Sequence, residues 1–520
     1  MPMRSWWMIA ITTLLLPVAA VAGSRAPDAP PDPPPDHPRL FDQVESFRLD
    51  NGMLFLLLSR RDVPMISGTI VVKVGNVDNP PGATGLAHMF EHMAFKGTDR
   101  IGTRDAAAER AVLDSISVAG DELTRLLRGD AEADSLAVAR LRGGIAALEE
   151  RAAAHVVPME FPRVYDGYTY DFNAYTNHDF TVYVATLPAN NLEVWMLMES
   201  ERLQNPVFRE FYAELAVVKE ERRQVLEDSP EAMARELLKS QAFSTHPYRY
   251  PVIGYMDDLE TLSPAQSVSF WRDYYAPDNM VAALVGDFDI DEAKAMIEDY
   301  FGDLSTRPTK GGPTVVEPAQ TGTRRGVHRQ GEERRLLMAF PGFGPGDPRR
   351  YAADLLSSVL TRDKTSRLVR RLDLEEGVAR NVSSSSTGGY QRYAGLFTIT
   401  VDLLENADNA GVEALVWEEL DRLQAEPVTQ DKLDEIRASY RKGFVFQLQT
   451  NGDLASLLAR TQASHGDWRR VYGRFEDYDR VTVAEVTALA GDLFRREKLS
   501  VVHLEPDVPD DAGSETGGGS

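Results

Sequence analysis

Short apolar runs bounded by polar turn residues predict several β-strands along the chain. The stretch Phe47–Phe55 reads as two strands around Asn51-Gly52, a dipeptide that favours a tight hairpin turn. β-Branched and aromatic residues mark three further strands, at residues 66–74, 172–176 and 181–184. Each run is too short for a typical helix, so strand is the better assignment.

Helical spacing of apolar residues predicts three shorter helices and one long helical region. The shorter helices start near Gly85, run from Asn191 to about Arg202, and run from Glu210 to about Glu227. From Thr103 to Ala153 the composition shifts to Ala, Leu, Arg and Glu, with a break around Asp130. We therefore predict a helical hairpin at about 103–153, inserted between the segments that carry the chemistry.

A linker divides the chain into two halves that end in the same way. Residues 305–326 are rich in proline and glycine and poor in apolar residues, which is typical of a linker. Each half ends in a helix followed by a strand, at residues 262–285 and 481–502, and this indicates an internal duplication. We expect an N-terminal domain at 40–304 and a C-terminal domain at 327–507.

The two ends of the chain fall outside these domains. An apolar run from Trp6 to Ala20 leads into Ala20-Val21-Ala22, whose small residues suit a signal peptidase. Residues 1–22 are therefore predicted to be a secretory signal peptide, with an uncleaved membrane anchor as the alternative. Residues 23–39, rich in proline and aspartate, predict an extended tether, and the Gly- and Ser-rich residues 508–520 predict a disordered tail.

Composition and charge narrow the function classes. With 520 residues, of which 43% are hydrophobic, the chain has enough apolar material for two cores. The absence of cysteine excludes a disulfide framework and a lipid attached through cysteine. A formal net charge of −24 argues against nucleic acid as a partner, because binding phosphates requires a basic face. After signal cleavage no stable membrane span is expected.

The strongest chemical signal is the pentapeptide His88-Met89-Phe90-Glu91-His92. On a helix, residues four apart lie on the same face, so His88 and His92 can reach one metal ion. Two neutral imidazoles suit zinc, and Glu91 lies beside that ion as a candidate base. H-x-x-E-H is the inverted form of a metallopeptidase motif. The alternative, two histidines that merely share a helix face in a core or in water, is weaker in this context.

A third ligand is expected from the helix that contains Glu214 and Glu221. These two residues are seven apart and therefore share a helix face, so one can bind the metal while the other supports the site. On composition alone, a solvent-exposed acidic helix would explain the same residues.

The sequence resembles the pitrilysin/insulinase family of inverted-motif zinc peptidases, and in particular its short, two-domain, processing-peptidase-like bacterial members. The resemblance covers residues 40–505, strongly in the first half and weakly in the second. The matching motifs are Asn51-Gly52, Pro80-Pro81-Gly82, Gly85–Met93, Phe95-Lys96-Gly97-Thr98, Asn173-Ala174-Tyr175-Thr176, Val218–Arg223, His246-Pro247-Tyr248 and Tyr275–Met280. It implies an α+β fold of two similar domains, each a mainly antiparallel sheet covered by helices, that enclose the substrate between them.

The resemblance also implies roles for the metal-site residues. One zinc ion per chain would be bound by His88, His92 and Glu221, with Glu214 as the supporting acidic residue. Glu220 and Glu227 stay open as alternatives to Glu221, because a shift of one residue in the alignment would select Glu220. A zinc-bound water, with its pKa lowered to about 7, would be the nucleophile. Glu91 would act as the general base.

Substrate binding is expected at Asn173 and Ala174. These residues match the family's edge strand, along which an extended peptide pairs by main-chain hydrogen bonds. His178 and His246 have no partner at ligand spacing, so we expect each to be an exposed or hydrogen-bonded histidine rather than part of a second metal site.

One departure from the family concerns the second half. Active members have an Arg and a Tyr there that complete the substrate site, whereas this chain has Asp373 and Arg380 at the corresponding places. We therefore expect a heterodimer in which a homologue supplies the Arg/Tyr pair; a homodimer is also possible.

These observations predict an exported, periplasmic or secreted zinc metalloendopeptidase that hydrolyses peptides or unfolded protein segments. One rival is a catalytically inert or assembly subunit of a peptidase-like complex, because the family includes such members. A second rival is a metal-dependent hydrolase of a non-peptide substrate, which only the resemblance disfavours.

Overall fold

The computed structural model describes residues 38–129, 135–386 and 390–507. The predicted signal peptide, most of the predicted tether and the predicted tail lie outside the described residues. The chain separates into two compact units, residues 1–43 and 44–520. In the first unit the described residues form one short helix, α1 (Pro38–Phe41). No helix within the described ranges is both long and apolar enough to span a membrane.

The first sheet has six strands in the order β1-β2-β6-β3-β5-β4, and every neighbouring pair is antiparallel except β2 with β6. The hairpin predicted around Asn51-Gly52 is present, since β1 and β2 pair on either side of it. Gly52 has a φ of 96°, a conformation that glycine adopts without the steric cost of a side chain. The strands are β1 (Glu45–Arg48), β2 (Leu54–Ser59), β3 (Met65–Val72), β4 (Asp171–Thr176), β5 (Thr181–Pro188) and β6 (Met280–Gly286).

The second sheet repeats this plan with five strands in the order β7-β11-β8-β10-β9. Its only parallel pair is β7 with β11, just as β2 with β6 is the parallel pair of the first sheet. The order β2-β6-β3-β5-β4 therefore has its counterpart strand by strand, which confirms two similar domains with mainly antiparallel sheets. The strands are β7 (Arg324–Arg329), β8 (Arg335–Pro341), β9 (Ala379–Ser386), β10 (Leu396–Leu403) and β11 (Ser500–Glu505).

The start of β7 differs from the sequence-based expectation. This strand begins at Arg324, within residues 305–326, which were predicted to be linker throughout. It is the outermost strand of its sheet and its alternate side chains are exposed. An edge strand of this kind buries little apolar surface, so its composition resembles that of a linker.

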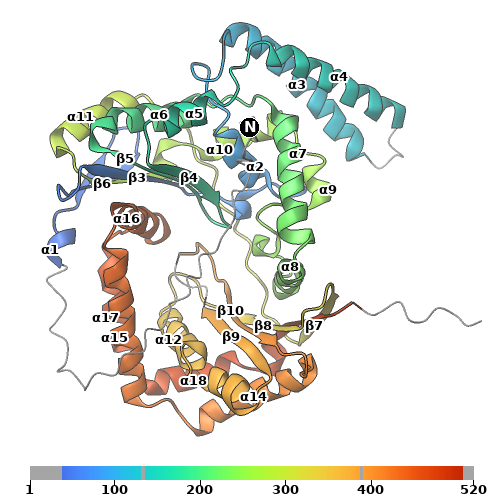
Figure 1. Ribbon diagram of the computed structural model, residues 1–520, viewed down its shortest axis with the longest axis vertical. Coiled ribbons are helices and arrows are strands. Elements are labelled where there is room, and N and C mark those ends of the chain that lie inside the picture. Colours follow the sequence, from blue (N-terminus) through green and yellow to red (C-terminus); the bar gives the residue numbers. More distant parts are fainter. Residues whose placement is uncertain (1–37, 130–134, 387–389, 508–520) are drawn as a thin grey trace, which may run out of the picture. The chain divides into compact units, whose positions relative to one another are not determined.

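Helices cover one face of each sheet, and the two hydrophobic cores lie between these layers (Figure 1). The first sheet is covered by α2 (Leu86–Met93), α5 (Glu160–Asp166), α6 (Leu192–Gln204), α10 (Pro264–Tyr274) and α11 (Ile290–Phe301), with α7 (Phe211–Arg222) and α9 (Met256–Leu259) beside α2. The helices of the second half are α12 (Arg349–Thr361), α13 (Arg367–Val369), α14 (Asn409–Ala425), α15 (Gln430–Gln447), α17 (Arg470–Arg480) and α18 (Val483–Leu493).

Each half also contributes one helix to the sheet of the other half. α8 (Pro230–Ala242) follows the first half's α7 but packs on β7, β8 and β11, where Leu238 is buried with Leu337 and Val502. α16 (Asn451–His465) belongs to the second half but packs on β3 and β6, and the hydroxyls of Thr69 and Ser456 lie 3.2 Å apart. This reciprocal exchange covers part of the second face of each sheet.

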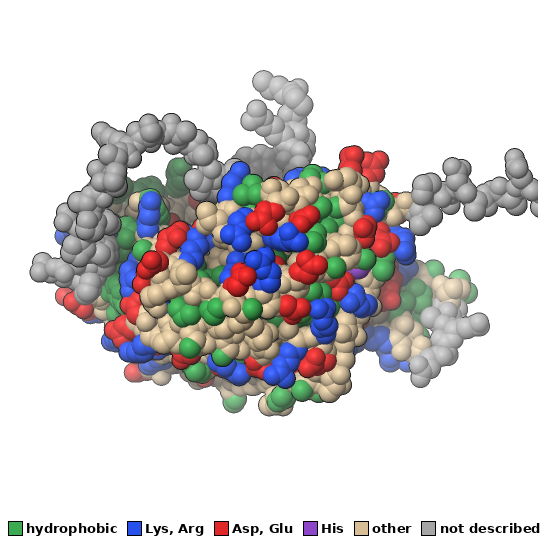
Figure 2. Space-filling view, turned by 90° about the horizontal axis from the view of Figure 1, so that it is seen from below, with side chains coloured by type: hydrophobic (Ala, Val, Ile, Leu, Met, Phe, Trp, Pro, Cys, Tyr) green, Lys and Arg blue, Asp and Glu red, His purple; other side chains and the backbone are tan. Residues whose placement is uncertain are grey.

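The segment expected to form an inserted hairpin contains two helices, α3 (Ala106–Leu127) and α4 (Ser135–Ala153). They pack on each other through a small core of their own, which includes Ile116, Leu123 and Ile145. Charged side chains of both signs are interspersed over the face of the described residues seen in Figure 2, rather than gathered by sign. Along α14, for example, Arg422 pairs with both Glu419 and Glu426.

Candidate metal centre

The helix that carries the histidines, α2, begins where only glycine fits. Gly85 precedes it with a φ of 86°, and a Cβ at this position would lie 2.4 Å from the carbonyl oxygen of Ile253. The apolar residues of α2, among them Met89 and Phe90, are buried in the first core. α2 is therefore held firmly against the sheet, with its histidines facing α7.

Three side chains from α2 and α7 converge on one point. The Nε2 atoms of His88 and His92 lie 3.8 Å and 3.5 Å from Oε2 of Glu221. The ligand atoms of all three residues lie within 4.8 Å of one another. Tetrahedral zinc with bonds of about 2.0–2.1 Å places its donors about 3.3 Å apart, so the set needs only a small contraction to hold one ion. Within the part of the chain that the structure describes, Nδ1 of His88 is buried without a hydrogen-bond partner.

The structure also separates Glu221 from the alternatives that the sequence left open. Glu220 lies on the exposed side of α7, where it accepts hydrogen bonds from Arg223 and Gln224. Glu227 lies in the π-helical turn after α7 and pairs with Arg222 at 3.3 Å. Of these three carboxylates, only Glu221 points at the two histidines.

Glu214 lies one helical turn inside the start of α7 and orients His92. Its Oε1 accepts a hydrogen bond from Nδ1 of His92 at 3.0 Å, which directs Nε2 of the ring towards Glu221. Its other oxygen contacts Nζ of Lys96 at 2.6 Å. A carboxylate behind a metal-binding imidazole in this way fixes the ring and its tautomer.

Glu91 is adjacent to His92 in the sequence but is not one of the three converging residues. Its side chain is buried, and Thr176 at the end of β4 donates hydrogen bonds to it, while Oε2 has no hydrogen-bond partner among the described residues. Burial raises the pKa of Glu91 above its ordinary value, against the opposing effects of His92 and Thr176. A carboxylate of this kind can both accept and return a proton.

The charges of the cluster are those of a cation site. Burial lowers the pKa of His88 to about 4, helped by the neighbouring His92. Burial acts in the same direction on His92, but hydrogen bonds to Glu214 and Glu221 outweigh it and raise its pKa to about 10. The pKa of Glu221 is lowered despite burial, through His92 and His88. The site thus favours one positive charge between the His92 imidazole and the Glu221 carboxylate. A metal ion bound there would supply that charge.

The predicted substrate residues lie in β4, the last strand of the first sheet. The backbone N–H of Ala174 donates to the Oδ1 of its neighbour Asn173 at 2.8 Å. Through Thr176, the end of β4 contacts Glu91, so the free edge of this strand leads to the metal-site cluster. β4 therefore adjoins the metal-site cluster at Thr176, and Asn173 and Ala174 lie two to three residues before that point along the strand.

His178 and His246 lie away from the metal-site cluster. The ring of His178 contacts Asn76 and Lys239, at 3.4 and 3.2 Å. His246 accepts a hydrogen bond from the backbone of Tyr248. Among the described residues, the only cluster of three potential ligands is His88, His92 and Glu221.

The second half places a different arginine and tyrosine near β4. Asp373 lies in a helical turn and Arg380 is exposed on β9. The guanidinium of Arg460 in α16, however, stacks on the ring of Tyr390 at 4.6 Å and hydrogen-bonds to Tyr175 of β4. No sequence pattern indicated this pair, because α16 was not expected to pack on the first sheet.

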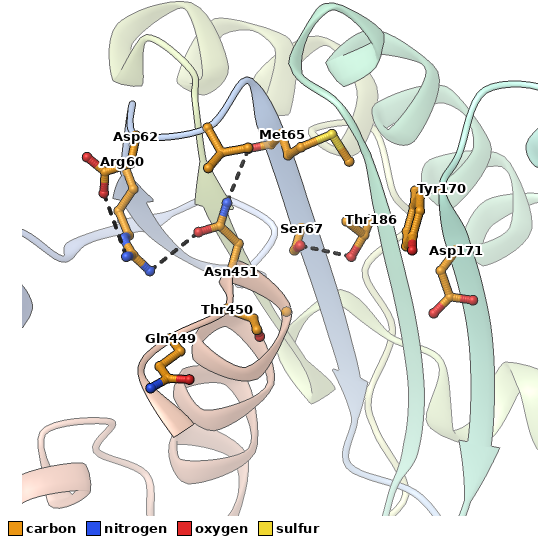
Figure 3. Close-up of a pocket in the computed structure, with 12 residues that line it drawn as sticks. Arg60, Asp62, Met65, Ser67, Tyr170, Asp171, Thr186, Gln449, Thr450 and Asn451 are labelled. Atoms are coloured by element: carbon orange, nitrogen blue, oxygen red, sulfur yellow. Dashed lines mark hydrogen bonds and ion pairs between the residues drawn. The ribbon is translucent and has the colours of Figure 1, made fainter. Parts of the chain in front are cut away.

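A pocket of about 320 Å³ lies at the other end of β4 (Figure 3). Tyr170 and Asp171 line it from the start of β4, and the first residues of α16 line it from the second half. Its floor includes the hydrogen-bonded hydroxyls of Ser67 and Thr186. None of its lining residues belongs to the metal-site cluster, so we assign the chemistry to the cluster and not to this pocket.

Comparison with known proteins gives the same family for both halves. A family model described as "Insulinase (Peptidase family M16)" matches residues 57–112 and 160–255, and one described as "Peptidase M16 inactive domain" matches residues 261–440. The unmatched residues 113–159 contain most of α3 and α4, in agreement with an insertion.

Individual relatives support this match over most of the chain. The zinc protease PqqE of Helicobacter pylori is 25% identical over 478 residues, which cover 89% of this chain and 93% of that protein. A crystal structure of a protease from Helicobacter pylori is similar with a TM-score of 0.73 and 22% identity, over 89% of this chain and 99% of that one. The periplasmic protease PqqL of Escherichia coli is similar with a TM-score of 0.64 and 18% identity, over 89% of this chain and 47% of that one.

Proposed function

Since the chain belongs to the insulinase family of peptidases, family M16, we propose that it is a zinc metallopeptidase that hydrolyses peptides or unfolded protein segments. The observation that carries this proposal is the convergence of His88, His92 and Glu221, with the buried carboxylate of Glu91 beside them. Two imidazoles and one carboxylate are a ligand set typical of catalytic zinc and leave a fourth position open.

The residues of the chain have distinct tasks in this mechanism. When bound, zinc supplies a Lewis acid that polarises the peptide carbonyl and lowers the pKa of water. Glu91 accepts a proton on its buried carboxylate as water attacks, and passes that proton to the leaving amine nitrogen.

The free edge of β4 is the proposed binding site for the peptide backbone. An extended peptide can add to the sheet there as one more strand, with its main chain leading past Thr176 to Glu91. The Ala174 N–H now donates to Asn173, so that side chain must release it when a peptide carbonyl takes its place. Recognition through main-chain groups requires an unfolded segment and tolerates many sequences.

The second candidate is a catalytically inert or assembly subunit. It is favoured by the match of residues 261–440 to a model described as an inactive domain, and the second half contains no H-x-x-E-H. The deciding experiment measures zinc content and cleavage of a quenched peptide library for the wild type and for Glu91→Gln. Cleavage by the wild type but not by Glu91→Gln supports the peptidase. Equal activity in both would refute the mechanism. Zinc without activity in the isolated chain would indicate a missing partner, and zinc without activity even with a homologous partner present would favour the inert subunit.

The partner is a separate proposal. A homologue carrying an Arg/Tyr pair would complete the site in a heterodimer, and a homodimer is the alternative. The stacking of Arg460 on Tyr390 beside Tyr175 provides an arginine and a tyrosine within this chain, which favours activity without a homologue. Activity of the purified chain at concentrations where it is monomeric by light scattering would refute the heterodimer.

Export to the periplasm, or secretion, is proposed from the apolar run at residues 6–20 and from the periplasmic location of PqqL. N-terminal sequencing of the mature protein should give a first residue near 23. An unprocessed Met1 in the cytosolic fraction would refute export.

A further inference from the structure

Lys96 connects the end of α2 to the start of α7. It lies three residues beyond the last residue of α2, and its side chain is only 14% exposed. Its Nζ contacts Glu214 at 2.6 Å and Glu210 at 3.4 Å. Glu214 in turn accepts a hydrogen bond from Nδ1 of His92. Only the Glu214 side chain therefore separates the ammonium of Lys96 from a proposed metal ligand.

The contact with Glu210 has a second effect. Glu210 is the residue that precedes α7 and has a φ of 56°, a left-handed conformation that is uncommon for a residue with a side chain. Lys96 thus contacts both Glu210, the strained residue just before α7, and Glu214 in the first turn of that helix. α7 also carries Glu221, so the same contacts help to fix the third proposed ligand.

Lys96 is itself held by a buried arginine. Arg209, which is 1% exposed, donates hydrogen bonds to the backbone carbonyls of Lys96 at 2.6 Å, Thr98 at 2.7 Å and Ile101 at 3.0 Å. A Cβ at Gly102 would lie 2.4 Å from Nη1 of Arg209, so the loop is shaped closely around the guanidinium. The loop that carries Lys96 is therefore wrapped around Arg209.

The charge of Arg209 is balanced from α3. Nε and Nη2 of Arg209 donate to the two carboxylate oxygens of Glu109, at 2.8 and 3.1 Å, and Glu109 is 1% exposed. A buried bidentate pair of this kind is directional, and removing one partner leaves an unpaired buried charge. The first turn of α3 is therefore tied to the loop of residues 96–102.

We propose that Lys96 is a positioning residue of the metal centre and that the Glu109–Arg209 ion pair holds it in place. The contacts run from Glu109 through Arg209 to the backbone of Lys96, and from its ammonium through Glu214 to His92. This inference rests on the proposed metal site but not on peptide cleavage. The role of Lys96 is to keep His92 and Glu221 at the separation that one metal ion requires.

The test measures zinc affinity of the full chain by competition with a chromogenic chelator, and the visible absorption spectrum of the cobalt-substituted protein. Lys96→Met should weaken zinc binding by about 10- to 100-fold, as is typical for residues that orient metal ligands, and should shift the cobalt spectrum. Lys96→Arg should restore most of the affinity. Glu109→Gln should also weaken zinc binding.

A matched control separates positioning from a general loss of stability. Lys294 on α11 forms an ion pair with Glu45 at 2.6 Å, the same length as the contact between Lys96 and Glu214. Lys294→Met removes this ion pair and should leave zinc affinity unchanged. If Glu109→Gln fails to fold, Lys96→Met and Lys96→Arg alone decide the outcome. Unchanged affinity and an unchanged cobalt spectrum in folded Lys96→Met would overturn the proposal. A wild type that binds zinc but cleaves no peptide, alone or with a homologous partner, would refute the proposed function and leave this inference standing.

Discussion

The carboxylate of Glu214 accepts a hydrogen bond from Nδ1 of His92 at 3.0 Å, while Nε2 of the same ring faces Glu221. An ionised carboxylate can accept hydrogen bonds but cannot donate them. When the His92 ring is neutral, its proton therefore lies on Nδ1 and its lone pair on Nε2. Nε2 is the atom that a metal must find unprotonated. Glu214 therefore determines which nitrogen of His92 is available to the ion.

The first prediction concerns Glu214. Glu214→Ala should raise the Kd for zinc by about 10- to 100-fold, because the ring of His92 loses its orientation. Glu214→Gln should fall between the wild type and Glu214→Ala, since its amide oxygen still accepts from Nδ1. Isothermal titration with zinc at fixed pH measures both values. Equal affinities for all three proteins would show that His92 is oriented by its packing alone.

The second prediction separates metal binding from proton transfer. Glu91→Gln should bind one zinc ion per chain with wild-type affinity within about threefold, because Glu91 is not among the three converging ligands. Its kcat should fall by about 10²–10⁴, the usual contribution of a general base. Zinc analysis by mass spectrometry and a quenched-peptide assay provide the two readouts. Loss of zinc together with activity would assign Glu91 to the ligand set instead.

Much of the metal centre could be predicted from the sequence because its signals are local. The four-residue spacing of His88 and His92 fixes their common face on one helix turn, and the seven-residue spacing of Glu214 and Glu221 fixes theirs over two turns. The sequence could not decide between Glu220 and Glu221 by chemistry, because both are glutamates. The structure distinguishes them through the exposed side of α7, on which Glu220 lies.

The residues that support the centre left no such signal. Lys96 and Glu214 are far apart in the sequence, and so are Glu109 and Arg209, so no helical or strand period relates them. An isolated Lys or Glu is read as a solvated surface residue unless the fold brings a partner to it. The exchange of α8 and α16 was missed for a similar reason: an amphipathic pattern shows that a face is covered, but not by which element.

The third prediction tests strand addition along β4. Ala174→Pro removes a backbone N–H of β4. This N–H donates to the side chain of Asn173 and does not point towards the neighbouring strand β5. Proline is tolerated on an edge strand, so the unfolding temperature should change little while KM for an unstructured peptide rises about tenfold. Zinc affinity serves as the control and should not change. A wild-type KM in a folded, zinc-loaded Ala174→Pro protein would place the peptide elsewhere.

The fourth prediction concerns Glu317, which fastens the segment before β7 to the first half. Its carboxylate accepts hydrogen bonds from the backbone N–H groups of Ser244, Thr245 and His246, and from the hydroxyls of the first two. Burial raises the pKa of Glu317, but these bonds outweigh it and lower the pKa from 4.5 to about 2. The folded state therefore favours the ionised carboxylate.

The sign of the pH dependence follows from this lowered pKa. The stabilisation is complete above pH 4.5, where the unfolded chain is also ionised, and it is lost as the pH falls towards 2. Because solvent partly screens this carboxylate, Glu317→Gln should cost about 1–2 kcal/mol at pH 7, and the difference from the wild type should shrink as the pH falls from 4.5 to 3. Urea unfolding between pH 7 and pH 3 measures it, with the exposed Glu332→Gln as a control expected to stay within about 0.5 kcal/mol of wild type. A difference that is constant with pH would show that Glu317 stabilises the segment by packing and not by its charge.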